Sequence, residues 1–288
     1  MNILVTGSNG QLGQTVMNME KAPGLRFLYT DVRAVDGVSC LDITDGSAVC
    51  NFMSDNEIDV VLNFAAYTDV ERAETEEELA FRVNAEAVGC LAEAAKKTGA
   101  TLVHISTDYV FDGSAGVPYG EDAEPAPLSA YGRSKLAGER ALLASGCRSI
   151  LIRTSWLYSP YGKNFVKTIL AKGAERPSLK VVSDQIGSPT FAQDLAGFIL
   201  TVLTPENLVK TGIYNYTDEG ICSWFDLAKE TCGIAGLNCD VTPCKTGEYP
   251  VKATRPAYSV LDKSKVKDTF GITIPPWKDS LRRCIAML

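Results

Sequence analysis

The sequence contains almost no histidine and no pattern of paired cysteines. Its 288 residues include one histidine, His104, and nine cysteines, none of them in a Cys-x-x-Cys pair. His104 lies inside a strand-like apolar run and is expected to be a core or edge histidine and not a catalyst. The closest two cysteines, Cys239 and Cys244, have no histidine nearby and lack the spacing of a zinc site. We therefore expect no metal site and no disulfide framework, and scattered reduced thiols favour a cytoplasmic location.

Long apolar runs and basic runs are missing as well. No apolar stretch approaches the length of a membrane span, and the opening "MNILVTG" leads directly into a strand without the parts of a signal peptide. The net charge of −7 and the absence of a Lys/Arg-rich run argue against nucleic acid or a membrane as a partner. Anionic small molecules stay open, because backbone amides and a few cations can bind a phosphate.

The first half of the chain alternates strand-like and helix-like segments. Apolar, β-branched runs at 2–7, 25–31, 59–66, 101–107 and 149–155 are separated by helical patterns at 11–19, 45–54, 77–98 and 129–145. Strands that are apolar on both faces and alternate with helices are typical of a parallel sheet covered on both sides. We predict a Rossmann-type, doubly wound α/β fold.

The alternation becomes less regular after Arg153. Helical patterns at 164–174, 191–203, 223–231 and 277–287 are joined by short strands at 180–184 and 212–216 and by turns rich in proline and glycine. We expect an NAD(P)-binding domain over 1–153. A smaller α/β substrate lobe over 154–288, interleaved with the first domain, would face the carboxyl edge of the sheet.

Three glycines follow the first strand at a spacing that suits a nucleotide phosphate. The stretch "VTGSNGQLG" places Gly7, Gly10 and Gly13 between that strand and the first helix. Such glycines permit a tight turn, a close approach of the backbone to a pyrophosphate and close packing of the helix on the strand. The amides at the helix N-terminus then attract the anion. A merely flexible turn is the alternative, and the position after an N-terminal strand favours the nucleotide.

Residues after the next strands could surround an adenosine. Asp31 ends the second strand, where a carboxylate can accept both ribose hydroxyls and would repel a 2′-phosphate, which favours NAD. Arg33 could instead pair with that phosphate, so NADP stays open. Asp42 and Ile43 are positioned to flank the adenine.

Small and polar residues end two further strands. Ala65 and Ala66 leave room for a dinucleotide, although they would equally suit close packing. Ser106, Thr107 and Asp108 follow another buried strand at the edge where open parallel sheets bind ligands. Because strand residues alternate in direction, only one of Ser106 and Thr107 should face the cofactor cleft.

The stretch "PLSAYGRSK" suggests an acid and a cation on one helix. Ser129 suits the N-cap, and Tyr131 and Lys135 then lie one turn apart on the same face. A phenol has an unperturbed pKa of about 10. A neighbouring ammonium would lower it toward a useful range. Most isolated Tyr-x-x-x-Lys pairs lie on solvated helix faces, and it is the glycine loop and the strand-end threonine that favour a catalytic role here.

These motifs, in this order, resemble the extended short-chain dehydrogenase/reductase family. The resemblance rests on the glycine loop, "STDYVFDG" and "YGRSK". The stretches "AAYTDVERAE", "RTSWLY", "NFVKTIL", "VVSDQIGSPT" and "TRPAYSVLD" are similar to its dTDP-4-dehydrorhamnose reductase branch. The similarity spans nearly the whole chain.

The resemblance implies a reaction and a role for each matching residue. NADPH or NADH would deliver hydride to the C4 ketone of dTDP-4-dehydro-6-deoxy-L-mannose, giving dTDP-L-rhamnose. Tyr131 would donate the proton, Lys135 would lower the phenol's pKa and hold the nicotinamide ribose, and Thr107 would hydrogen-bond the reacting oxygen. The implied cofactor contacts are Gly10, Gln11, Leu12, Asp31, Asp42, Ile43, Ala65, Ala66, Tyr67, Tyr131 and Lys135, with Gly7 and Gly13 shaping the loop.

Substrate contacts fall in both halves of the chain. The resemblance implies Thr107 and Asp108 as sugar contacts and Trp156 as a pocket wall. From the residues alone, Arg255 could clamp a phosphate, or could be a surface arginine before a proline. Weaker candidates are Gln185 and Thr190.

The sequence departs from the family at one position, and it leaves alternatives open. Some members are described as metal-bridged dimers that use a glutamate just past the glycine loop, where this chain has Thr15. We therefore expect no bound metal and a monomer or weak homodimer. Another nucleotide-sugar reductase or epimerase, or a non-catalytic NADP-binding regulatory subunit, would share the fold.

Overall fold

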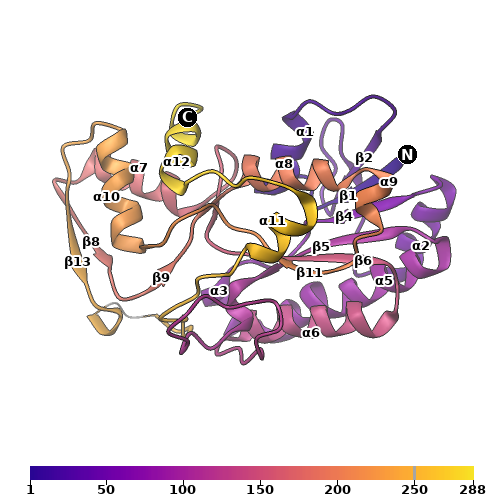
Figure 1. The fold of residues 1–288 in the computed structure, drawn as a ribbon, viewed down its shortest axis with the longest axis horizontal. Coiled ribbons are helices and arrows are strands. Elements are labelled where there is room, and N and C mark those ends of the chain that lie inside the picture. Colours follow the sequence, from indigo (N-terminus) through magenta and orange to yellow (C-terminus); the bar gives the residue numbers. More distant parts are fainter. Residues whose placement is uncertain (249–250) are drawn as a thin grey trace.

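The computed structural model describes residues 1–248 and 251–288 and is built around a seven-stranded sheet (Figure 1). Its strands are β1 (Asn2–Thr6), β2 (Arg26–Asp31), β3 (Ser39–Cys40), β4 (Val60–Asn63), β5 (Thr101–Thr107), β6 (Ser149–Thr154) and β11 (Gly212–Asn215). They lie in the order β11-β6-β5-β4-β1-β2-β3, and every neighbouring pair is parallel. The predicted doubly wound α/β fold is confirmed.

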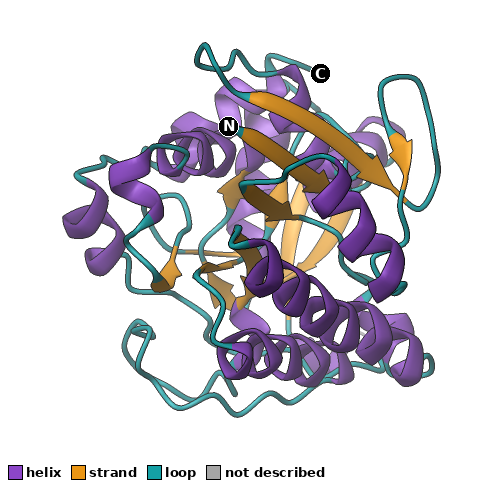
Figure 2. Ribbon diagram, turned by 90° about the vertical axis from the view of Figure 1, so that its right-hand side faces the viewer, coloured by secondary structure: helices purple, strands orange, loops and turns teal. Residues whose placement is uncertain are grey.

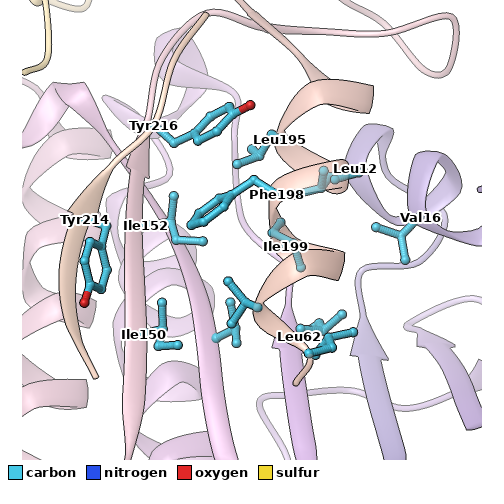
Figure 3. Close-up of a cluster of buried hydrophobic side chains, with 14 of the residues drawn as sticks. Leu12, Val16, Leu62, Ile150, Ile152, Leu195, Phe198, Ile199, Tyr214 and Tyr216 are labelled. Atoms are coloured by element: carbon cyan, nitrogen blue, oxygen red, sulfur yellow. The ribbon is translucent and has the colours of Figure 1, made fainter. Parts of the chain in front are cut away.

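Successive residues of each central strand feed two different cores. Ile3 and Val5 of β1 lie in one cluster and Leu4 in the other, and β6 divides Ile150 and Leu151 in the same way. Because strand side chains alternate between faces, continuous apolar strands supply both layers at once. Figure 3 shows the first cluster, where Phe198 points from a covering helix toward the sheet.

Helices cover both faces of the sheet. One face carries α1 (Gln11–Asn18), α8 (Ala192–Val202) and α11 (Ser264–Phe270), and the other carries α2 (Gly46–Asp55), α5 (Ala87–Thr98) and α6 (Ala130–Ser145). Figure 2 shows the strands as a twisted stack with helices on either side. Short helices α3 (Val70–Ala73) and α4 (Glu77–Phe81) and a π-helical turn (Arg82–Glu86) precede α5. The helix expected over 77–98 is therefore divided by a π-helical turn.

The later part of the chain adds a smaller layer beside the sheet. It contains α7 (Phe165–Glu175), α10 (Trp224–Ile234), α12 (Trp277–Ile285) and the parallel pair β8 (Ser178–Val182) and β13 (Asp240–Cys244) (Figure 1). Between these elements the chain returns to the sheet in α8, β11 and α11. The division into 1–153 and an interleaved 154–288 stays a prediction.

The remaining elements are short. They are β7 (Leu157–Tyr158), β9 (Ile186–Gly187), β10 (Thr190–Phe191), β12 (Cys222–Ser223), α9 (Pro205–Leu208) and two 3-10 turns (Asp108–Val110 and Thr246–Glu248). Within 1–248 and 251–288, no helix combines the length and apolar character needed to cross a membrane.

Candidate active site

A cleft of about 840 Å³ opens at the carboxyl edge of the sheet and is lined by both parts of the chain. The predicted site residues that line it are Gly7, Gly10, Gln11, Leu12, Asp31, Ile43, Ala65, Ala66, Tyr67, Thr107, Asp108, Tyr131, Lys135, Trp156 and Arg255. Gly13 and Asp42 are not part of this lining. Gln185 and Thr190 also lie outside it: Gln185 hydrogen-bonds Thr246, and the buried Thr190 hydroxyl accepts from Thr154.

The glycine loop requires glycine for two distinct reasons. Gly7 has φ +66, and a Cβ there would lie 2.5 Å from the Ala65 nitrogen, so both the conformation and the space exclude a side chain. A Cβ at Gly13 would lie 2.5 Å from the Gly7 oxygen, which explains why this glycine shapes the loop from below without lining the cleft. At Gly10 the nearest atom to a Cβ is the Gly7 oxygen at 3.1 Å, so this position borders the open cleft.

The N-terminus of α1 faces the cleft without a cap. Gly10 is the N-cap and supplies no side-chain acceptor, so amides of the first turn have no side-chain partner. Together with the helix dipole, these amides form a site for an anion such as a pyrophosphate. The Gln11 side chain is held away from that role, because its Oε1 accepts from Ser159 and Asn164, each at 3.0 Å.

The adenosine end of the cleft is shaped by the ends of β2 and of the strand after it. The Asp31 Oδ2 accepts the Asn9 amide at 3.0 Å, so this carboxylate also fastens the glycine loop. Arg33 is exposed two residues further on. Ile43 lines the cleft, whereas the Asp42 carboxylate accepts from the amide and the hydroxyl of Thr44 at 2.9 and 2.8 Å.

A residue that the sequence reasoning missed, Asn84, braces the segment after β4. Its side chain accepts from the Tyr67 amide at 2.8 Å and donates to the Tyr67 carbonyl at 3.0 Å. Its Nδ2 also donates to the Ser134 hydroxyl of α6 at 3.0 Å. The π-helical turn brings Asn84 to this buried position, and a π-bulge of this kind is frequent at functional sites. A lone asparagine in a helical pattern gave no signal of this.

Helix α6 carries the predicted tyrosine and lysine and is held very close to its neighbours. Ser129 caps it by accepting the Gly132 amide at 3.1 Å, as expected. A Cβ at Gly132 would lie 2.2 Å from the Tyr109 oxygen, and one at Gly138 would lie 2.0 Å from the Asn84 oxygen. The two glycines therefore let α6 approach the site backbone more closely than any other residue would allow.

Tyr131 is a protonated phenol at neutral pH. Burial raises its pKa to about 12, and a hydrogen bond with the Thr107 hydroxyl opposes that rise. This direction is the reverse of the lowering expected from Lys135, because burial outweighs any effect of that ammonium. A group that must give up a proton benefits from keeping it until charge develops on its partner.

Lys135 lies beneath the cleft and is 2% exposed. Its Nζ donates to the Ile105 carbonyl of β5 at 2.7 Å. Burial lowers the pKa of the ammonium to about 8, and the Glu139 carboxylate opposes that shift. Lys135 therefore remains mostly charged at neutral pH.

Thr107 and Asp108 stand together at the end of β5. The Thr107 hydroxyl donates to the Asp108 Oδ1 at 3.1 Å and accepts from the Tyr109 amide at 3.2 Å. The Asp108 Oδ2 is buried without a hydrogen-bond partner among the described residues, and burial raises the pKa of this carboxyl to about 6. The hydroxyl of Ser106 is directed elsewhere, to Glu139 at 2.5 Å.

Trp156 forms a wall together with a second tryptophan that the sequence reasoning missed. Its φ of +49 places a bulky residue in the left-handed region, a strain that structures tolerate mainly at functional sites. Its ring stacks on that of Trp224 at 3.6 Å and 12°, and Trp224 also lines the cleft. A Cβ at Gly187 would lie 2.8 Å from the Trp156 ring, so glycine makes room for this arrangement.

Arg255 reaches the cleft from the later part of the chain. Its Nη2 donates to the Glu71 Oε1 at 2.9 Å, and its buried Nε has no partner among the described residues. Glu71 also accepts the amides of Lys252 and Ala253 at 2.9 and 3.3 Å. The guanidinium is thus fixed at the cleft wall, and its Nε–H remains available to donate a hydrogen bond.

Thr15, the position at which the sequence departs from the family pattern, bonds within its own helix. The Thr15 hydroxyl donates to the Gln11 carbonyl at 2.7 Å within α1. In the described ranges, no group of three or more His, Cys, Asp or Glu residues is arranged to hold a metal ion.

Comparison with known proteins gives consistent relatives over the whole chain. The sequence profile of the RmlD substrate binding domain matches residues 1–288. A dTDP-4-dehydrorhamnose reductase from Sinorhizobium fredii is 38% identical, with 99% of this chain and 97% of the relative covered. One from Aggregatibacter actinomycetemcomitans is 39% identical, with 97% of each covered.

Solved structures agree with the sequence relatives. A dTDP-4-dehydrorhamnose reductase from Clostridium acetobutylicum superposes with a TM-score of 0.93 at 42% identity, covering 100% of this chain and 99% of the other. One from Bacillus anthracis, in complex with NADP, has a TM-score of 0.92 at 36% identity, with 99% of both chains covered.

Proposed function

The chain belongs to the RmlD substrate binding domain family and to the dTDP-4-dehydrorhamnose reductases, and we propose how its own residues perform the reduction. The substrate is the C4 ketone of dTDP-4-dehydro-6-deoxy-L-mannose and the product is dTDP-L-rhamnose. The cofactor, NADPH or NADH, supplies the hydride. The observation that carries the mechanism is that Tyr131, Thr107 and Lys135 line the same cleft as the uncapped N-terminus of α1.

Tyr131 donates the proton to the C4 oxygen as charge develops there. Its raised pKa keeps the proton in place before reaction, and an alkoxide is basic enough to take it from a phenol. Thr107 lies next to the phenol and hydrogen-bonds the same oxygen, which stabilises the developing charge. The two hydroxyls therefore act on one atom of the substrate.

Lys135 provides the positive charge beneath this pair. Its ammonium favours the phenolate left after proton transfer and donates to the nicotinamide ribose. The bond to the Ile105 carbonyl uses one of its three protons and leaves the others for these contacts.

The carboxyl edge of β1, β2 and β4 would hold the cofactor. Its pyrophosphate is bound by the α1 N-terminus at Gly10, Gln11 and Leu12. Adenosine contacts come from Asp31, Ile43 and the neighbouring turn at Asp42. Ala65, Ala66 and Tyr67 give the dinucleotide room along the end of β4.

The substrate occupies the part of the cleft nearer the later lobe. Asp108 accepts from a sugar hydroxyl through its unpartnered Oδ2, and Trp156 forms the pocket wall. Arg255, fixed by Glu71, directs its remaining donors to the diphosphate. The guanidinium can serve Glu71 and a phosphate at once, because it carries five N–H donors.

The test is consumption of NADPH or NADH in the presence of dTDP-4-dehydro-6-deoxy-L-mannose. We expect turnover that depends on the sugar nucleotide and yields dTDP-L-rhamnose. Tyr131→Phe should lower kcat by at least about 100-fold while cofactor affinity stays within a few-fold. Tyr119→Phe, which removes a phenol outside the cleft, is the matched control. Retained turnover in Tyr131→Phe would mean that the acid is misassigned.

Two related functions make different predictions in the same assay. An epimerase or a reductase of another nucleotide sugar would bind the cofactor and convert a different substrate. A regulatory subunit would bind NADP without turnover of any sugar nucleotide. The complete set of Thr107, Tyr131 and Lys135 in one cleft argues against a regulatory subunit, because binding alone does not need an acid beside a buried cation.

A further inference from the structure

A buried ion pair joins the catalytic helix to β6. Glu139 of α6 and Arg153 of β6 are joined by two bonds, Nη2 to Oε2 at 2.7 Å and Nε to Oε1 at 3.0 Å. Both side chains are almost inaccessible, 3% exposed for Arg153 and 2% for Glu139. Ser106 donates a further hydrogen bond to Oε1 at 2.5 Å.

Glu139 follows the catalytic pair on the same face of α6. Tyr131, Lys135 and Glu139 succeed one another at intervals of four residues, so the carboxylate lies one turn beyond the ammonium. Within the described residues, the Lys135 ammonium donates one hydrogen bond, to the neutral Ile105 carbonyl. A buried ammonium with a neutral acceptor alone would tend to lose its proton.

The same carboxylate connects the three segments that carry the site. Ser106 precedes Thr107 at the end of β5, and α6 carries Tyr131 and Lys135. Arg153 is the last residue but one of β6, three positions before the strained Trp156. A buried ion pair is weak evidence for stability, because desolvation offsets its attraction. Its position under the reacting groups suggests a use beyond stability.

We propose that Glu139 is a positioning residue for the reduction: its carboxylate keeps Lys135 charged and fixes the ends of β5 and β6 around Tyr131. This inference rests on the proposed function, because it gives Lys135 its charge for that reaction. Arg153 is the counter-ion of this buried carboxylate.

Of the titratable neighbours of Lys135 on β5 and α6, Glu139 is the charged one. His104 of β5 is fully buried, and burial followed by the Lys135 charge lowers its pKa well below 6.5, so it is neutral. Tyr131 of α6 is neutral because burial raises its pKa to about 12. Glu139 is therefore the acidic partner of the ammonium on α6, and Arg153 of β6 is the cation behind it.

Two substitutions break the same ion pair but change the charge near Lys135 in opposite directions. Glu139→Gln removes the negative charge and leaves Arg153 positive, so the pKa of Lys135 should fall by about one unit or more. Arg153→Gln leaves Glu139 unneutralised, so that pKa should rise. A purely structural role predicts the same change for both variants.

The direct measurement is an NMR titration of the lysine Cε signals, assigned by the loss of one signal in Lys135→Met. The alkaline limb of kcat/KM should move with the titration, to lower pH in Glu139→Gln and to higher pH in Arg153→Gln. Glu139→Asp, which keeps the charge, should restore the wild-type titration. Shifts of equal sign, or no shift, would overturn the proposal.

The design separates this inference from the proposed function. The titration needs no turnover, so opposite shifts without reductase activity would support the electrostatic role and refute the reaction. Should a single variant fail to fold, the double substitution Glu139→Gln/Arg153→Gln removes both charges. It should leave Lys135 with a pKa below the wild-type value, and an unchanged pKa there would also refute the proposal.

Discussion

Asp108→Asn should stabilise the protein at alkaline pH even though it alters the substrate pocket. The Asp108 side chain is 1% exposed, and its Oδ2 has no hydrogen-bond partner among the described residues. Burial raises the pKa of this carboxyl from 3.8 to about 6. The folded protein therefore holds the ionised form of Asp108 at a cost in stability.

The magnitude follows from the difference between the two pKa values. One pKa unit corresponds to about 1.4 kcal/mol, so a shift from 3.8 to about 6 is worth about 3 kcal/mol. Because the folded-state pKa is the higher one, the folded state binds the proton more readily, and stability falls as pH rises between the two values. The cost is complete above about pH 6 and is only about 0.5 kcal/mol at pH 4.

Urea unfolding of wild type and Asp108→Asn at pH 4 and pH 8 measures this cost. The isoelectric point near 5.0 leaves both conditions clear of zero net charge. The variant should gain about 2.5 kcal/mol relative to wild type between pH 4 and pH 8, whatever its packing defect, because that defect is the same at both values.

A control of opposite sign is available in Asp112. Hydrogen bonds from the Ser114 amide and hydroxyl and from Tyr119 lower the pKa of this carboxyl. Asp112→Asn should therefore lose stability, relative to wild type, as pH rises from 4 to 8. If wild type and Asp108→Asn changed in parallel over that range, the carboxyl would not carry the burial cost inferred here.

Three further substitutions test the binding surfaces. Gly7→Ala should abolish cofactor binding and lower Tm, whereas Gly24→Ala, with φ +83 but nothing within 4 Å of its Cβ, should cost only about 1 kcal/mol of strain; equal effects on cofactor affinity would refute the clash. Trp224→Leu should raise KM for the sugar nucleotide about tenfold with cofactor affinity unchanged, because it frees the Trp156 ring, and an unchanged KM would contradict this. Arg33→Ala should weaken NADPH about tenfold and leave NADH affinity within twofold if the exposed guanidinium meets the 2′-phosphate; equal losses would assign it no such role.

Most of the sheet could be predicted because its signals are local. Residues close together in the sequence indicate both the apolar strand before Gly7 and the helix that begins at Gln11. The later lobe was less predictable. Strands β9, β10 and β12 have two residues each, too few to show a period, and the parallel pairing of β8 with β13 joins segments about sixty residues apart.

The same distinction applies to the site. The glycine loop, Thr107 and the Tyr131–Lys135 pair have a fixed spacing that suggests their chemistry, and they line one cleft. Asn84 and Trp224 have no such spacing. Asn84 acts through a π-helical turn, and Trp224 through a stack with a residue in a different segment, so neither role follows from nearby sequence.

For α6, residue spacing predicts which side chains share a face, but it does not predict their pKa values. The spacing of Tyr131 and Lys135 correctly suggests that their side chains share a face, because helix geometry fixes it. Their proton affinities depend instead on burial by β5 and β6, which no spacing on α6 records. Burial alone lowers the pKa of the Lys135 ammonium, so keeping it charged requires a negative group within the core. Glu139, at the next turn of α6 and paired with Arg153, supplies that negative charge while this face of the helix stays buried.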